Sequence, residues 1–521
     1  MIKDIKIIQA VSSISQRAER QRDINKIVSS YVEVGILPQL LNNNNQILYG
    51  RRGTGKTHIL KIYENFYKAD KTKTVCYIDC RFLGSSPQFA DTTLSISHRC
   101  SSLFTDVLNE IYDVLLNHIA YEPNLSSEQA LNSLADLSKS SIEEIQKSKR
   151  VINKSKNAEH SGSSLQLGIG LDSVGANFGA KNESIEENEH TIEFNTEEYE
   201  KIIFPDLHYH LKKVLEFADT ELLIVIDEWS AIPFDIQPFL AEFLKKSFIP
   251  IPEVTIKIGA LEYRTNFTIP REKHNYIGLE LGSDISTNLD IDEYYVYDRN
   301  PDEIVKTFLD ILHRHIISEL PEGYLEKEYG VKTSNQFLQS IFSGKPAFTE
   351  LVRASEGVIR DFINIFNLAF FDTQRKGLKS IDKRTVIEAG RQWFENDKSK
   401  NLDDFLHSKI RLIIEEVIGK RKARSFLVSR ELERNSTIQK LFDARVIHLV
   451  KRGYSDKDNP GIRYNIYSLD YGTYVDLLNT TKEPELDFIE DRADTDEIVV
   501  PFDDKRSIRR IIGSITSAPC Y

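Results

Sequence analysis

A glycine-rich segment close to the N-terminus constrains the fold of this chain more than any other feature. Gly50–Thr57 has the sequence Gly-Arg-Arg-Gly-Thr-Gly-Lys-Thr, which fits G-x-x-x-x-G-K-[ST] at every fixed position. It follows the strand-like run Gln46–Tyr49 and precedes the helix-like run His58–Tyr67. This order predicts a phosphate-binding loop whose backbone N–H groups wrap a phosphate. A structural glycine turn with an exposed lysine is the alternative, and the flanking strand and helix disfavour it.

The residue types in this loop indicate a nucleotide and a metal ion as ligands. We expect Lys56 to neutralise the β- and γ-phosphate oxygens of ATP, and the Thr57 hydroxyl to ligate Mg²⁺. Nucleotide contacts are expected along the whole loop and from the histidine after it, namely from Gly50, Arg51, Arg52, Gly53, Thr54, Gly55, Lys56, Thr57 and His58.

Two acids after a buried strand would complete such a site. The apolar run Leu222–Ile226 is followed directly by Asp227 and Glu228. We expect Asp227 to hold Mg²⁺ through water, and Glu228 to orient and deprotonate the attacking water. An acidic pair that only caps a buried strand is common, but downstream of a phosphate-binding loop it predicts hydrolysis of ATP to ADP and phosphate.

The order of apolar runs predicts an α/β fold. Strand-like runs at 46–49, 74–79, 222–226 and 255–261 alternate with helix-like stretches at 58–67, 103–121, 199–217 and 236–248. This alternation predicts a parallel sheet covered by helices. We divide the chain into a helical segment (1–45), an α/β domain (46–300) with an insertion at about 126–200, a helical domain (301–400), a fourth domain (401–478) and an acidic, then basic tail (479–521).

Composition limits the partners and the location. The net charge of -12 excludes a globally basic coat for nucleic acid. No apolar run approaches the ~18 residues of a membrane span, and Met1–Lys6 lacks a signal-peptide pattern, so we expect a cytoplasmic protein without a membrane partner. The four cysteines are too few for a disulfide framework, and Cys76 and Cys80 are interpreted as buried apolar residues rather than metal ligands.

The fourth domain carries a local positive charge. Between Lys420 and Arg463 there are twelve Lys and Arg against five Asp and Glu, a net charge of +7. A helix at Asn435–Ala444 followed by alternating β-branched residues fits a winged helix. Its expected DNA-phosphate contacts are Arg434, Lys440, Arg445, Lys451, Arg452 and Arg463. Winged helices also dock proteins or act only as structural modules, so both alternatives stay open.

A third motif lies in the helical domain, at Ser355–Ile363. Phe362, Ile363 and Phe366 lie on one apolar face, whereas Arg360 lies on another face with Asn364. From the residues alone, the favoured interpretation of Arg360 is a solvated arginine.

Together, Gly50–Thr57, Ile224–Glu228 and Gly357–Arg360, followed by a segment that fits a winged helix, resemble the AAA+ ATPases of the origin-recognition and replication-initiator group, including bacterial relatives. The resemblance covers about 46–470. It implies an ASCE-type P-loop α/β domain, a helical lid and a C-terminal winged helix. It also implies a catalytic set of Lys56, Glu228 and Arg360, because a lid arginine of the family touches the γ-phosphate.

Two family features have no clear counterpart in the sequence. The family expects an Asn or Thr at the end of the strand after the acid-bearing strand. Here Thr255–Ala260 runs into Leu261–Asn266, and the choice among its polar residues stays open. An arginine finger acting on a neighbouring copy could be Arg264 or Arg271.

Three functions fit these expectations. The first is an ATP-driven switch or remodeller that acts on DNA, with homo-oligomerisation as an option and with phage defence or mobile-element biology as the setting. The second is a STAND-type signalling NTPase, although the long sensor-repeat array typical of that class is not present. The third is a nucleotide-stabilised adaptor that docks a protein partner through its winged helix and its tail, for example through Val499–Arg510.

Overall fold

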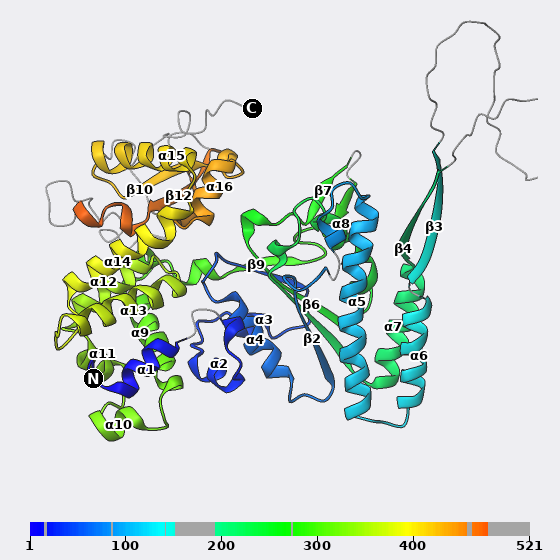
Figure 1. Ribbon diagram of the computed structural model, residues 1–521, viewed down its shortest axis with the longest axis horizontal. Helices are drawn as coiled ribbons and strands as arrows, with labels where there is room; N and C mark the ends of the chain where they lie inside the picture. The colour runs from blue at the N-terminus through cyan, green and yellow to red at the C-terminus, as the bar shows by residue number, and fades with distance from the viewer. Residues whose placement is uncertain are drawn as a thin grey trace, which may run out of the picture.

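The computed structural model describes residues 1–14, 18–84, 87–140, 142–151, 193–271, 275–455 and 461–477 (Figure 1). The tail at 479–521 and the glycine-spaced middle of the expected insertion, 162–179, lie outside the described residues. Within the described part of the chain, no helix is both long and apolar enough to cross a membrane.

A five-stranded parallel sheet confirms the predicted α/β fold. Its order is β2-β5-β6-β1-β9, and the strands are β1 (Gln46–Tyr49), β2 (Lys73–Asp79), β5 (Glu221–Asp227), β6 (Val254–Ala260) and β9 (Ser286–Asp290). One strand, β6, lies between the strand that leads into the phosphate-binding loop and the strand that carries the two acids. Because all five strands run in the same direction, both segments reach the same edge of the sheet.

Helices cover both faces of this sheet, which explains why its central strands are almost continuously apolar. Alternate residues of β5 enter different cores: Leu223 and Val225 pack on the side of α4 (Lys56–Tyr67), and Ile224 and Ile226 on the opposite side. The opposite side is covered by α5 (Ile96–Tyr121), α7 (Phe204–Ala218) and α8 (Gln237–Phe248) (Figure 1). The sheet is therefore a rigid base for the residues at the ends of its strands.

An antiparallel pair of strands projects from this domain. Helix α6 (Ser127–Ser140) leads into β3 (Ile142–Val151), which pairs with β4 (Glu193–Ile202) (Figure 1). The helix predicted at 199–217 is present as α7, but it begins later than predicted, at Phe204, because β4 continues to Ile202. Pro205 occupies the first turn of α7, the one place in a helix where a missing N–H does no harm.

The described part of the chain before the sheet contains three short α-helices, of which the first two lie against the later helical region and the third lies against α4. These are α1 (Ile5–Ser13), α2 (Ile24–Ser30) and α3 (Leu37–Leu40). The helical region itself comprises α9 (Pro301–Glu319), α10 (Tyr324–Tyr329), α11 (Ser334–Ile341), α12 (Lys345–Ser355), α13 (Ile359–Arg375) and α14 (Lys383–Trp393). Its apolar residues share one core with those of α4, so the helical region and the sheet are packed together.

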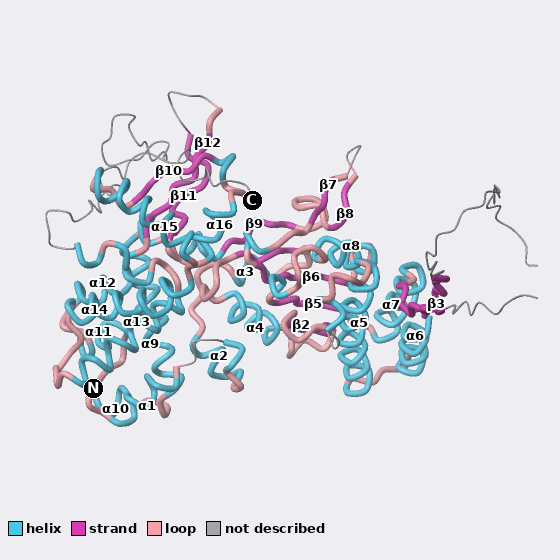
Figure 2. The backbone as a smooth tube through the Cα atoms, turned by 45° about the horizontal axis from the view of Figure 1, so that its top comes forward, coloured by secondary structure: helices cyan, strands magenta, loops and turns pink. Residues whose placement is uncertain are grey.

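Residues 404–477, which we term the C-terminal module, follow the helical region. The module contains α15 (Asp404–Ile414), β10 (Ser425–Ser429), α16 (Ser436–Asp443), β11 (Ile447–Ser455) and β12 (Arg463–Leu469). Its strands form an antiparallel sheet in the order β10-β12-β11, separate from the parallel sheet (Figure 2). This order of helices and strands is compatible with the expected winged helix.

Candidate nucleotide site

The loop between β1 and α4 has a backbone that requires glycine. Gly53 and Gly55 have φ angles of +89° and +102°, in the left-handed region that side chains disfavour. A Cβ atom on Gly53 would lie 2.7 Å from the side chain of Arg360, and one on Gly50 would lie 2.8 Å from Thr54 Oγ1. The loop therefore packs too closely for side chains at these positions. It ends at the N-terminus of a twelve-residue helix, where unpaired N–H groups attract anions.

Lys56 is buried at the centre of this loop. Its ammonium group donates hydrogen bonds to the carbonyl oxygens of Gly50 at 2.6 Å and Arg51 at 3.0 Å. Burial lowers the pKa of Lys56, while the nearby carboxylates of Glu228 and Asp292 oppose this shift. The site thus holds a buried cation within a ring of backbone dipoles, which suits a phosphate.

The two predicted halves of the site are in direct contact. Thr57 Oγ1 donates a hydrogen bond to Asp227 Oδ2 at 2.7 Å, although 170 residues separate them. Asp227 is fully buried at the end of β5, and its Oδ1 accepts a bond from the backbone N–H of Glu228 at 2.8 Å. Tyr77 also donates to Asp227 Oδ2, at 2.7 Å. Sequence reasoning missed Tyr77, whose position within β2 gives no chemical signal.

Thr57 and Asp227 are the residues that could hold Mg²⁺. Their hydroxyl and carboxylate oxygens are the ligand type that Mg²⁺ prefers. Among the described residues, no group of three or more His, Cys, Asp or Glu side chains could hold a metal ion. A magnesium ion at this pair would therefore complete its coordination with phosphate oxygens and water, which is its usual mode of binding in nucleotide sites.

Glu228 adopts a backbone conformation that is unusual for a side chain of its size. Its φ and ψ are 55° and 40°, in the left-handed region, and the side chain lines the cavity described below. Such strain persists where the surrounding structure enforces it, often at functional sites. Burial raises the pKa of Glu228, and Asp227 adds to this shift, while Lys56 opposes it. A carboxylate with a raised pKa is suited to accept a proton from water.

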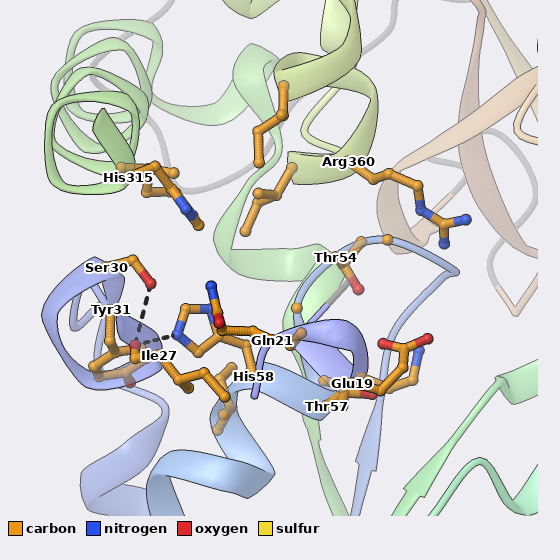
Figure 3. Close-up of a pocket in the computed structure, with 18 of the residues that line it drawn as sticks. Glu19, Gln21, Ile27, Ser30, Tyr31, Thr54, Thr57, His58, His315 and Arg360 are labelled. Atoms are coloured by element: carbon orange, nitrogen blue, oxygen red, sulfur yellow. Dashed lines mark hydrogen bonds between the residues drawn. The ribbon is translucent and has the colours of Figure 1, made fainter. Parts of the chain in front are cut away.

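Arg360 reaches the loop from the helical region. Its backbone N–H donates to the carbonyl oxygen of Gly53 at 3.0 Å, and its side chain lies beside Thr54 (Figure 3). The preceding turn requires Gly357, which has φ +77° and whose Cβ would lie 2.3 Å from the carbonyl oxygen of Tyr295. The start of α13 is thereby held against the loop, and the predicted Gly-x-x-Arg setting brings Arg360 into the site.

A cavity of about 330 Å³ joins these groups to a second set of residues. Arg52, Gly53, Thr54, Gly55, Lys56, Thr57, Glu228 and Arg360 line it on one side. Opposite them it extends between α2, α4 and α9, where Tyr31, His58 and His315 surround the space (Figure 3). The lining does not include Gly50, Arg51 or Asp227, so these three predicted site residues do not face the cavity directly.

The second part of the cavity has the chemistry of a site for a flat ring. His58 Nε2 donates to the carbonyl oxygen of Ile27 at 2.7 Å, and its ring lies 5.7 Å from Tyr31 and 6.2 Å from His315, centre to centre. Burial lowers the pKa of His315 to about 3, so this imidazole is neutral at pH 7. Sequence reasoning predicted only His58 here, because Tyr31 and His315 belong to no motif.

Two of the six residues expected to contact DNA phosphates instead form ion pairs with acidic residues of the same chain. Arg445 is buried and forms ion pairs with Asp361 and Asp397. Arg452 forms ion pairs with Glu262 at 2.5 Å and Glu433 at 2.9 Å. The prediction that these two arginines contact DNA is therefore wrong for this conformation, because positive charge in the sequence does not reveal its partner. Arg434, Lys440 and Arg463 are exposed, and Lys451 is half-buried.

The candidates for the remaining family features lie away from the cavity. None of the residues 261–266 lines it. Arg264 pairs with Asp443 of the C-terminal module at 2.6 Å, and Arg271 is exposed after β7 (Thr268–Pro270). The choice between these two arginines as a finger therefore stays open.

Comparison with known families bears on the segment that contains the loop. Residues 14–67 match the model of the family described as ORC-CDC6-like. The predicted resemblance to the origin-recognition group is thus confirmed. The matched segment includes α2, β1, the phosphate-binding loop and α4, and it contains Tyr31, Lys56 and His58, which line the cavity. No curated protein matches the chain.

Solved structures similar to this chain include Cdc6p of Pyrobaculum aerophilum, with 13% identity, coverage of 90% of this chain and 95% of that one, and a TM-score of 0.33. The ORC1 protein of Aeropyrum pernix in complex with DNA has 13% identity, coverage of 89% and 93%, and a TM-score of 0.33. RuvB of Thermotoga maritima has 12% identity, coverage of 52% and 83%, and a TM-score of 0.24.

Proposed function

We propose that this chain binds ATP with Mg²⁺ in the cavity between the loop, α2 and α13, and that it hydrolyses ATP to ADP and phosphate. The observation that carries the proposal is the hydrogen bond between Thr57 and Asp227, which joins the two halves of the site beside Lys56 and Glu228. Turnover of ATP by the purified protein tests it directly.

The residues divide the work of hydrolysis. Backbone N–H groups of the loop and the ammonium of Lys56 bind the phosphate oxygens, and Arg360 adds positive charge from the lid side. Glu228 holds a water molecule and takes its proton as the water oxygen bonds to the γ-phosphorus, while the bond from that phosphorus to the bridging oxygen breaks and ADP leaves. Thr57 and Asp227 would hold Mg²⁺, which when bound would neutralise charge on the phosphate oxygens. Tyr31, His58 and His315 enclose the nucleotide base in the second part of the cavity.

The lid arginine gives a specific prediction. Replacement of Arg360 by alanine is expected to lower turnover by about 10²–10³-fold, because the charge that develops on the phosphate loses a nearby cation. Nucleotide affinity is expected to change much less. Steady-state ATPase assays check this, and Arg375→Ala, an exposed arginine at the far end of α13, is the matched control. If the two variants lowered ATP turnover equally, Arg360 would be interpreted as a solvated arginine without a part in hydrolysis.

We further propose that ATP drives a DNA-associated activity, as the ORC-CDC6-like match supports. The exposed cations of the C-terminal module, Arg434, Lys440 and Arg463, are the candidate phosphate contacts. The STAND alternative gains no support from the family match. Protein docking through the module remains the second candidate, since Arg445 and Arg452 show that much of the positive charge serves contacts within the chain.

A role in phage defence rests on resemblance alone, and an unchanged plaque count on cells that carry the gene would oppose it.

The DNA contacts can be tested by charge reversal. In the double variant Arg434→Glu and Lys440→Glu, the slope of log affinity against log salt concentration is expected to shrink by about 2, because each lost phosphate contact contributes about 1. Fluorescence anisotropy with duplex DNA at several salt concentrations measures this slope. The control is Lys345→Glu, an exposed lysine of α12 outside the module. Equal slopes in the double variant and the control would favour protein docking.

A further inference from the structure

The side chain of Arg51 leaves the phosphate-binding loop and is buried against the C-terminal module. Only 6% of it is exposed. Its Nε donates to Asp292 Oδ1 at 3.1 Å, and a second N–H of the guanidinium donates to Nδ1 of His448 in β11. The guanidinium carbon lies 5.2 Å from the ring centre of Phe442 in α16. A single residue of the loop thus contacts both a strand and a helix of the module.

His448 accepts this bond as a neutral imidazole. Because Nδ1 faces a donor, the proton lies on Nε2, which donates to Asp470 Oδ2 at 2.8 Å. Burial lowers the pKa of His448 to about 3, and the guanidinium of Arg51 contributes to the shift, while Asp470 opposes it. The histidine is therefore a fixed acceptor for Arg51 at neutral pH.

The same network reaches the lid. Asp470 also pairs with Lys398 at 2.5 Å, and Lys398 pairs with Asp361 at 3.2 Å. Asp361 follows Arg360 directly in the first turn of α13. All three charged groups are buried, and a buried pair that loses one member leaves an uncompensated charge, so these contacts resist separation. The loop and the lid arginine are consequently fastened to one and the same module.

We propose that Arg51 is a positioning residue that couples nucleotide binding to docking of the C-terminal module. The proposal rests on the nucleotide site proposed above. The backbone N–H of Arg51 donates to Asp292 Oδ2 at 2.8 Å, so both ends of the residue are fixed, and the docked module holds the loop in its phosphate-binding shape. Coupling of this kind is reciprocal: docking strengthens nucleotide binding, and nucleotide strengthens docking by the same factor.

Affinity measurements on variants of His448 test the coupling. His448 does not line the cavity, so an effect of its replacement on nucleotide affinity must pass through Arg51. In the full-length protein, His448→Leu removes the acceptor and is expected to weaken binding of a fluorescent ATP analogue about tenfold. His448→Asn places a carbonyl oxygen near the position of Nδ1 and is expected to restore most of the affinity. Lys420→Ala removes an exposed lysine of the module that pairs with Glu416 within the module rather than across the interface, and is expected to leave affinity unchanged.

The reciprocal effect provides a second readout. Hydrogen exchange in β11 is expected to slow about tenfold when ATP is added to the wild type, and to show no such slowing in Arg51→Met, which keeps the bulk of the side chain but loses its donors. Arg51→Met also supplies the affinity test if His448→Leu does not fold. The coupling would be overturned, without any effect on the proposed function, by equal ATP affinity in the wild type and in these variants. It would also be overturned if the hydrogen-exchange rate in wild-type β11 did not change when ATP is added. A wild type that binds no nucleotide would overturn the proposed function as well.

Discussion

Replacement of Lys56 by alanine is expected to abolish nucleotide binding, with a loss in affinity of at least about 100-fold. The ammonium group is buried in the loop and supplies the cation for the phosphate oxygens, so its charge-assisted hydrogen bonds are lost in a site shielded from water. The change also removes the positive charge that acts on the nearby carboxylates of Glu228, Asp292 and Asp227, so their negative charge repels the phosphates more strongly. Isothermal titration of ATP in the presence of Mg²⁺ measures the loss.

The matched control lies on the same helix. Lys68→Ala removes an equal charge at the C-terminal end of α4, where the side chain is exposed and pairs with Glu64 at 2.9 Å. Affinity in this variant is expected to stay at the wild-type value. ATP bound equally well by Lys56→Ala would show that the loop is a structural turn, the alternative raised by its sequence.

The second large effect is expected at Glu228. Replacement by glutamine keeps the size and polarity of the side chain but removes the proton acceptor, so turnover is expected to fall by about 10²–10⁴-fold. ATP binding is expected to persist, because Lys56, Thr57 and Asp227 remain. Single-turnover hydrolysis and a binding titration on the same variant separate the two steps. The control is Glu110→Gln, on the exposed side of α5. Hydrolysis at the wild-type rate in Glu228→Gln would show that Glu228 is not the proton acceptor.

The parts of the fold that were predictable are those with a strong local signal. The loop after β1 is marked by its glycines, and β5 by five apolar residues before Asp227, because buried parallel strands exclude polar side chains. By contrast, β9 has the sequence Ser-Thr-Asn-Leu-Asp and was not predicted. It lies at the edge of the sheet with β1 as its one partner, so its side chains need not be apolar. The strand β10 has only three consecutive apolar residues, too few to distinguish it from a helix turn.

The candidate site was predictable only as far as its motifs extend. Lys56, Thr57, Asp227 and Glu228 follow from chemistry that requires those residue types. Residues that complete the cavity, such as Tyr31 and His315, are 284 positions apart in the sequence and come together only through the packing of α2 on α9. No local pattern distinguishes them from ordinary surface residues.

Charge gave the least reliable guide to contacts. The local net charge of +7 between Lys420 and Arg463 predicted a surface for DNA, yet Arg445 and Arg452 pair with acids of the helical and α/β regions. Arg51 likewise matched a variable position of the loop and turned out to be bound by the C-terminal module. The sequence gives the sign of each side chain's charge. The ion-pair partner of that side chain depends on which segments the fold brings together.

The central claim is that ATP and Mg²⁺ are bound between the loop at Gly50–Thr57 and the acids Asp227 and Glu228. The most direct measurement is ATP turnover by the full-length protein as a function of Mg²⁺ concentration, for the wild type beside Lys56→Ala and Glu228→Gln. We predict turnover that rises and saturates with Mg²⁺ in the wild type and is lost in both variants. Turnover that is independent of Mg²⁺, or that survives in either variant, would contradict the account.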